Sequence, residues 1–414
     1  MLLCVTVLDD IVRQGMSPVL LSLLSIYHQE RDLPAMRKQT NQLTAYLSRR
    51  VILRGLAGFI VTMSIDACAQ PGSSSTTVPT PTPRPYGRVI STYRAHTMRV
   101  TTVAWSPDGK YIASGSLDKT VQIWSANSAA RFHPFIYRGH GAGVSTVGWS
   151  PDSRRVASGA YDTTVQIWDA TTGEHIAICR GHTDAVMTVA WSPDGKYIAS
   201  GSADGTVRLW NAATGKQQYI YRGHTDSVNS VSWSPDSQRV ASGSSDKTVQ
   251  ILDATTGEHI FTYRGHTATV SSVSWAPDGQ HLASGSWDKT VQVWGAATGK
   301  VSYVYQGYNV KAAQISTARG VLPDLIFVVA WSHNGKRIAA VTQVYCGDTC
   351  GVVVSWDADT QRNVAFYIDT PVFALAWSPD DTRFVTATEV TTQGSSVSNV
   401  KASEDGPYAQ ISQA

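Results

Sequence analysis

The sequence carries little net charge and has no basic stripe. Its 34 Lys and Arg residues nearly balance 31 Asp and Glu residues, which leaves a formal net charge of +3 over 414 residues. Because the two signs are interspersed, we expect no nucleic acid among its partners. Charged residues make up only 16% of the chain and apolar residues 42%, which is enough to bury a sizeable core.

Long hydrophobic runs are also missing. The run "GLAGFIVTMSI" at 55–65 has 11 residues, which is too short to span a bilayer but suits the core of a signal peptide. It follows "SRRVILRG" at 48–55, which resembles the twin-arginine export motif. It precedes "IDAC", which resembles a lipoprotein box and would make Cys68 the lipidation site.

These signals together predict an exported, extracytoplasmic protein anchored to the cell membrane. The signal segment would occupy residues 36–68, with Met36 as the true start and residues 1–35 as an untranslated or disordered leader. Residues 69–85, rich in Ser, Thr and Pro, would form a flexible linker. The alternative is a buried helix followed by a linker in a cytoplasmic protein.

Cysteine is scarce, with five copies. Cys346 and Cys350 share one predicted loop, where an extracytoplasmic setting would permit a disulfide between them. Free thiols are the alternative. A metal site is less favoured, because two cysteines with no nearby His supply too few ligands.

Glycine and tryptophan, by contrast, are plentiful, with 33 and 13 copies, which favours an all-β protein with many turns. One sequence unit recurs about every 42 residues. Each copy has a His, a Ser 18 residues later and an Asp four residues after that Ser: His96, Ser114 and Asp118; His140, Ser158 and Asp162; His182, Ser200 and Asp204; His224, Ser242 and Asp246; His266, Ser284 and Asp288. An enzyme needs one nucleophile in one special setting, so five copies at constant spacing predict architecture and not a catalytic triad.

Each unit predicts four short strands. In the third unit these are "VMTVAWS", "KYIASGS", "TVRLWNA" and "QQYIYRG", separated by "PDG", "AD" and "ATG" turns. Four strands cannot bury both faces of a sheet alone, so the units must stack. Radial stacking into a propeller buries those faces and protects the strand edges.

The pattern "GH…WSPDG…IASGS.D.TV.IW" across residues 88–300 resembles the WD-repeat β-propeller family. The resemblance implies a buried, hydrogen-bonded tetrad in each unit, in which Trp124, Trp168, Trp210 or Trp294 joins the His, Ser and Asp. Leu252 replaces the Trp in the fourth unit, so we expect an incomplete tetrad in a unit that still forms.

Two weaker units follow residue 300, which leads us to expect an all-β, seven-bladed propeller over residues 86–414. Its last sheet would combine "SSVSNVKAS" at 395–403 with a fourth strand from 86–96, closing the ring. The sixth unit carries two insertions, "NVKAAQISTARGVLPD" and the predicted loop "QVYCGDTC" at 343–350. Both would open on one face, where loops often carry function.

In the family, partners usually dock on that same face. The positions that the resemblance directs there are Arg99, Thr101, Leu117, Ser145, Tyr161, Met187, Ala203, Asn229, Ser245, Ser271, Trp287, Phe327 and Phe373. We selected Arg99, Leu117, Tyr161, Met187, Asn229, Trp287, Phe327 and Phe373 as partner-binding residues, because Trp, Tyr and Arg are enriched at binding hot spots. Packing against neighbouring loops is the alternative role for Tyr161 and Trp287.

Three function classes stay open. The favoured one is a monomeric, non-catalytic scaffold that binds a protein or peptide, with no cofactor and no metal. The second is a propeller enzyme or quinone-cofactor protein, since the "DATTGEH" turns at 169–175 and 253–259 faintly resemble repeats of such proteins. The third is an envelope-assembly lipoprotein with no discrete ligand.

Overall fold

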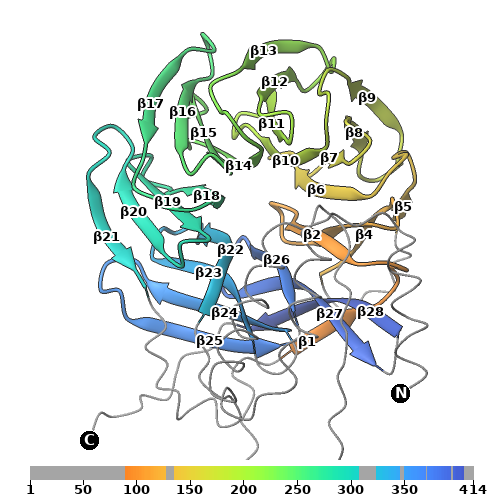
Figure 1. The fold of residues 1–414 in the computed structure, drawn as a ribbon. Coiled ribbons are helices and arrows are strands. Elements are labelled where there is room, and N and C mark those ends of the chain that lie inside the picture. Colours follow the sequence, from red (N-terminus) through yellow and green to blue (C-terminus); the bar gives the residue numbers. More distant parts are fainter. Residues whose placement is uncertain are drawn as a thin grey trace, which may run out of the picture. The chain divides into compact units, whose positions relative to one another are not determined.

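A computed structural model of the chain describes residues 89–126, 135–306, 323–345, 349–369, 371–392 and 395–404 (Figure 1). All of them belong to the second of two units, Thr80–Ala414. The predicted leader, signal segment and linker at 1–35, 36–68 and 69–85 lie outside the described residues, and Cys68 with them. A search of the described residues for a helix that could span a membrane finds none.

The described elements are strands in seven four-stranded antiparallel sheets, numbered here along the chain. Sheet 1 contains β2 (Val100–Trp105), β3 (Tyr111–Ser116), β4 (Val121–Ser125) and β5 (Phe135–Tyr137). Sheet 2 contains β6 (Val144–Trp149), β7 (Arg155–Ala160), β8 (Val165–Asp169) and β9 (His175–Cys179). Sheet 3 contains β10 (Val186–Trp191), β11 (Tyr197–Ser202), β12 (Val207–Asn211) and β13 (Gln217–Tyr221).

The remaining sheets repeat this order. Sheet 4 contains β14 (Val228–Trp233), β15 (Arg239–Ser244), β16 (Val249–Asp253) and β17 (His259–Tyr263). Sheet 5 contains β18 (Val270–Trp275), β19 (His281–Ser286), β20 (Val291–Gly295) and β21 (Val301–Tyr305). Sheet 6 contains β22 (Pro323–Trp331), β23 (Arg337–Tyr345), β24 (Thr349–Asp357) and β25 (Asn363–Asp369). Sheet 7 contains β26 (Val372–Trp377), β27 (Arg383–Thr392), β28 (Ser395–Glu404) and β1 (Val89–Tyr93).

Sheet 3 illustrates why each repeat folds as a meander. The first strand ends at Trp191, and the Ser192 hydroxyl then donates to the Asp194 carboxylate over 2.6 Å, which tightens the turn. Gly195 completes that turn at a φ of 71°, a left-handed conformation that glycine adopts without strain. The chain returns with Ile198 opposite both Trp191 and Trp210.

The sheets follow one another around a ring (Figure 1). Each first strand contacts the first strand of the next sheet, from β2 through β6, β10, β14, β18 and β22 to β26, and β26 contacts β2. Strand β1 completes sheet 7 by pairing antiparallel with β28, with Tyr93 opposite Val400. This is the closing pair expected from the sequence, and it joins the two ends of the described chain in one sheet.

The core lies between neighbouring sheets. One cluster, for example, combines Ala157 and Val165 of sheet 2 with Val186, Trp191 and Trp210 of sheet 3, each less than a tenth exposed. Burial of one such large apolar side chain contributes about 1.5–3 kcal/mol. Because each sheet shares its apolar faces with two neighbours, stability depends on the whole ring.

The second insertion of sheet 6 differs from the sequence-based prediction. Instead of a long loop at 343–350, β23 extends to Tyr345 and β24 starts at Thr349, so that only residues 346–348 separate the two strands. Val344 pairs with Cys350 in this extension. Strand pairing satisfies the backbone groups that a loop would leave to water, which is why the prediction of a loop was wrong. The proposed Cys346–Cys350 disulfide depends on Cys346, which lies outside the described residues.

Candidate functional site

The five recurring His, Ser and Asp sets come together as hydrogen-bonded groups. In each, His Nδ1 lies 2.8–2.9 Å from the Asp carboxylate, and His Nε2 lies 2.7–2.9 Å from the Ser hydroxyl. The His comes from the connection that enters a sheet, the Ser from the second strand, and the Asp from the turn that follows this strand.

In sheet 3, the indole of Trp210 fixes which groups of the His182, Ser200 and Asp204 set donate and which accept. Trp210 Nε1 donates to Ser200 Oγ over 2.7 Å, so the Ser200 hydroxyl is directed to donate to His182 Nε2. His182 Nδ1 then donates to Asp204. This is also the bonding order of a hydrolase triad. However, the Ser200 side chain is fully buried and the His182 side chain is 1% exposed, so no substrate reaches them.

The indole member is present in only part of the ring. Trp294 donates to Ser284 over 3.1 Å, as Trp210 does to Ser200, but Trp124 and Trp168 have no hydrogen-bond partner for their N–H groups in the described part of the chain. The expectation of a bonded indole in all four copies was therefore wrong for two of them. These rings stack on a tyrosine of the preceding outer strand, since Trp168 lies 4.7 Å from Tyr137 and Trp124 lies 5.0 Å from Tyr93. Trp294 both stacks on Tyr263, at 4.2 Å, and bonds Ser284.

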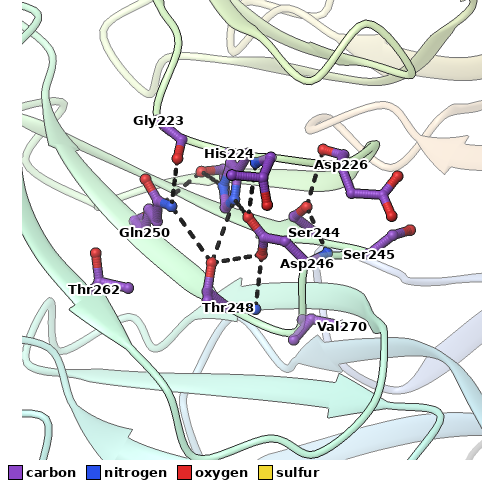
Figure 2. A network of polar contacts seen from close by, with 12 residues as sticks. Gly223, His224, Asp226, Ser244, Ser245, Asp246, Thr248, Gln250, Thr262 and Val270 are labelled. Atoms are coloured by element: carbon purple, nitrogen blue, oxygen red, sulfur yellow. Dashed lines mark hydrogen bonds and ion pairs between the residues drawn. The ribbon is translucent and has the colours of Figure 1, made fainter.

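Sheet 4 lacks the indole because Leu252 takes its place, yet its polar network is intact (Figure 2). His224 bonds Asp246, whose carboxylate also accepts from the Thr248 hydroxyl over 2.6 Å. Gln250 Nε2 donates to the Gly223 carbonyl over 3.2 Å. The network fastens the connection that enters the sheet to its second and third strands.

Hydrogen bonding keeps the five Asp residues ionised. Burial alone would raise the pKa of Asp288, but hydrogen bonds from His266 and Thr290 lower that pKa to about 2. The pKa values of Asp118, Asp162, Asp204 and Asp246 are held below their ordinary value in the same way. Burial also lowers the pKa of His182, which favours the neutral imidazole required by the donor order above.

A Tyr–Gln pair adjoins four of the five His–Ser–Asp sets, and the fifth set, that of sheet 3, has different residues at both positions. In sheets 1, 2, 4 and 5, a tyrosine hydroxyl of the preceding outer strand donates to a Gln of the third strand, as from Tyr137 to Gln166 over 2.6 Å. For the set of sheet 3, these two positions hold Cys179, from the preceding outer strand β9 of sheet 2, and Arg208, from β12. The Arg208 guanidinium fills the space beside Gly181 that the Tyr137 hydroxyl fills beside Gly139. Arg208 donates to Gln217, and its Nε atom has no partner among the described residues.

The turns that carry the Asp residues open at one side of the ring, here called the loop face. It is the side of the turns 117–120, 161–164, 203–206, 245–248 and 287–290 and of the connections that carry the five His residues. Trp287 and Tyr161 are the exposed large side chains of these turns, with 40% and 42% of their surface accessible. The Trp287 ring lies 6.5 Å from that of Phe327, and the Arg99 guanidinium lies 4.6 Å from the ring of Phe373.

The side chains of the other predicted contact residues differ in burial and in hydrogen bonding. Leu117 and Met187 are half-buried. Asn229 is engaged, since its amide donates to Ser245 Oγ and to the Val270 carbonyl, each over 3.0 Å. Thr101, Ser145 and Ser271 donate in the same way to a carbonyl of the next sheet. These four positions tie neighbouring first strands together, a role that the sequence pattern did not reveal.

Sequence reasoning missed one exposed apolar residue on this face. Met98, two positions after His96, has 53% of its surface accessible, more than any other large apolar side chain of the described residues. Its signal in the sequence is an apolar residue in the connection that enters a sheet, where the other units carry Gly, Ala or a polar residue. Together with Arg99 it extends the exposed surface to sheet 1.

Among the described residues, no group of three or more His, Cys, Asp or Glu side chains is placed so that it could hold a metal ion. Cys179 is a free thiol with 1% of its surface exposed, and burial raises its pKa to about 12. It therefore stays protonated and unreactive in the folded protein.

Comparisons with known proteins match this architecture. A family model described as the WDR19 first beta-propeller matches residues 100–269, and the model of the WD domain, G-beta repeat, matches residues 257–295. The chain belongs to the WD-repeat β-propeller family. The all-β WD-repeat propeller predicted from the sequence is thus confirmed.

Several individual proteins are similar to the chain over short segments. The chain is 51% identical over 41 residues to Protein HIRA of Zea mays, which is 10% of this chain and 4% of that protein. It is 38% identical over 68 residues to Protein Mut11 of Chlamydomonas reinhardtii, or 16% and 18% of the two chains. It is 56% identical over 36 residues to Actin-interacting protein 1 of Drosophila melanogaster, or 9% and 6%. The matched segments thus span less than a fifth of each relative.

Proposed function

We propose that this WD-repeat protein is a non-catalytic scaffold that binds a protein or peptide on its loop face. The observation that carries the proposal is the exposure of Trp287 and Tyr161 beside tetrad residues that are themselves buried. A large aromatic side chain left in water costs solvation free energy, and aromatic residues are the commonest anchors of protein interfaces.

The surroundings of these two aromatics support an interface. Phe327 stands beside Trp287, and the Arg99–Phe373 pair adds a cation–π contact on the neighbouring sheets 7 and 1. Of the similar proteins, one is named for interacting with actin, which fits a binding role for the family but does not indicate the partner of this chain.

We further propose that the propeller is exported and held at the membrane surface. The support is the order of signals before residue 86: an arginine pair, a short apolar run, Cys68 and a Ser, Thr and Pro-rich tether. Mass spectrometry of the natural protein tests this part. A chain that begins at Cys68 with an attached lipid supports it, and an unprocessed cytoplasmic chain contradicts it.

A pull-down from native membranes tests the scaffold. The immobilised propeller should retain a specific partner that the double variant Trp287→Ala, Tyr161→Ala loses. Ile176→Ala, Ile260→Ala is the matched control, because these two exposed apolar residues lie on the outer strands β9 and β17. Loss of the partner in the control, or retention in the loop-face variant, would contradict the assignment of this face.

A further inference from the structure

The side of the ring opposite the loop face carries the turns between third and fourth strands, and a side-chain oxygen closes most of them. The last residue of the third strand accepts the backbone N–H groups two and three positions later, at 2.7–3.2 Å. It is Asp169, Asn211, Asp253 or Asp357 in sheets 2, 3, 4 and 6. These oxygens satisfy amide groups that the turn leaves without a backbone partner.

Sheet 5 has Gly295 at this position and so lacks the oxygen. Its turn, 296–300, has the same sequence as the turn 212–216 of sheet 3, "AATGK". In sheet 3, Asn211 Oδ1 accepts from the Ala213 N–H over 3.1 Å and from the Thr214 hydroxyl over 3.0 Å. In sheet 5, the Ala297 N–H has no protein partner within the described residues.

A cleft is present where the oxygen is missing. It has a volume of about 380 Å³ and is lined by Gly295, Ala297 and Thr298 of sheet 5, together with Arg239 of sheet 4. Gln280 and His281 form a further part of its wall, and His281 is paired with Asp278 over 2.7 Å.

Arg239 is held in place with part of its guanidinium unused. The group stacks 4.6 Å from the Trp275 ring, and Nη2 donates to the Gly279 carbonyl over 2.9 Å. Asp236 lies 3.7 Å from the same nitrogen. Nη1 and Nε have no hydrogen-bond partner in the described part of the chain. In sheet 2, by comparison, Nη1 of Arg155 donates to the Ala212 carbonyl over 3.3 Å.

We propose that this cleft binds a carboxylate, whose oxygens take the place of the missing side-chain acceptor beside Gly295 and face the Arg239 guanidinium. The Ala297 N–H and the Thr298 hydroxyl would donate to one oxygen, as their counterparts in sheet 3 donate to Asn211. Arg239 would contact the carboxylate through its free edge. A cationic or neutral ligand would leave that edge unmatched.

The test is an NMR titration of the full chain with sodium acetate, with sodium chloride at the same ionic strength as reference. The amide signals of Ala297 and Thr298 should shift in a saturable manner with acetate and not with chloride. Gly295→Asn, which restores the acceptor found in sheet 3, should weaken acetate binding at least tenfold. The absence of a saturable shift in the natural chain, or an equal affinity in Gly295→Asn, would overturn the proposal.

A gain-of-function variant makes the test independent of any loss of folding. Asn211→Gly removes the acceptor oxygen of sheet 3, where Arg155 of sheet 2 occupies the position of Arg239. Nη1 of Arg155 already donates to the Ala212 carbonyl, so the new site should bind acetate more weakly than the cleft beside Gly295. We expect new saturable acetate shifts at Ala213 and Thr214 in that variant, and their absence would count against the proposal. A short peptide with a free terminal carboxylate, compared with its amidated form, identifies the source. If the peptide with the free carboxylate binds more tightly than acetate and the amidated peptide does not, the natural ligand is a protein C-terminus. If the free peptide and acetate bind with equal affinity, the natural ligand is a small acid.

Discussion

Trp287 and Phe327 lie with their rings 6.5 Å apart and inclined by 50°, although they belong to different sheets. Trp287 sits in the turn after β19, and Phe327 sits in β22. The pair spans the boundary between sheets 5 and 6 at the loop face, with 40% of Trp287 still exposed. Two sheets thus contribute to one aromatic surface that the folding of either sheet alone does not require.

Replacement of Trp287 by Ala should therefore leave stability nearly unchanged. We expect the free energy of unfolding to fall by less than about 1 kcal/mol, since a largely exposed side chain loses little burial. Trp275→Ala is the matched comparison, because Trp275 is 6% exposed in the core of the same sheet and should cost about 3–5 kcal/mol. Chemical denaturation of both variants measures the difference. Similar losses in both would mean that Trp287 is a core residue.

Replacement of His182 should destabilise the ring without removing an activity. His182→Ala leaves Ser200 and Asp204 buried without their shared partner, and we expect a loss of about 3 kcal/mol. His175→Ala, at an exposed position of β9, should cost less than about 0.5 kcal/mol. Thermal melting compares the two. A His182→Ala protein as stable as the natural one would contradict a structural role for the set.

Acid should remove the contribution of the tetrad carboxylates. The pKa of Asp288 is about 2 in the folded protein, below the value of about 3.9 in an unfolded chain. Its stabilising effect is therefore complete above about pH 5 and is lost as the pH falls toward 2. The difference in melting temperature between the natural chain and Asp288→Asn should stay constant from pH 7 to pH 5 and narrow below pH 4. A difference that widens in acid would refute this linkage.

The positions of Cys179, in β9 of sheet 2, and Arg208, in β12 of sheet 3, should be energetically coupled. Cys179→Tyr places a hydroxyl in the space that the Arg208 guanidinium fills, so this single variant should be destabilised by steric overlap. Arg208→Gln alone should leave the new Gln side chain without the tyrosine hydroxyl that donates to the corresponding Gln in sheets 1, 2, 4 and 5. The double variant restores the pair seen at Tyr137 and Gln166 and should be more stable than either single variant. Additive losses in a double-mutant cycle would show that the two positions do not interact.

The repeats made most of this fold predictable from the sequence. Constant spacing indicated that His182, Ser200 and Asp204 have the same structural role as their counterparts in the other copies. The resemblance to the WD-repeat family implied that they form one hydrogen-bonded group, as they do in the structure. The closing pair of β1 and β28 followed from the same logic, since the last unit lacked a fourth strand. The period itself carried the information.

The parts that could not be predicted depend on contacts between sheets. Whether Trp168 bonds Ser158 or only stacks on Tyr137 is decided by small shifts in packing that no local pattern encodes. Nothing in the sequence around Asn229 indicates that its side chain is engaged, yet its amide donates a hydrogen bond to the Val270 carbonyl of the next sheet. The extension of β23 to Tyr345 depends on pairing with β24 and not on the turn-forming residues between them.

The most direct test of the account measures stability and partner binding on the same sample of the variant Trp287→Ala, Tyr161→Ala. We predict a melting temperature within a few degrees of the natural protein, together with loss of the partner retained from native membranes. A variant that still binds this partner, or one that loses it only because the propeller has unfolded, would contradict the claim that the buried sets build the ring and the loop face performs recognition.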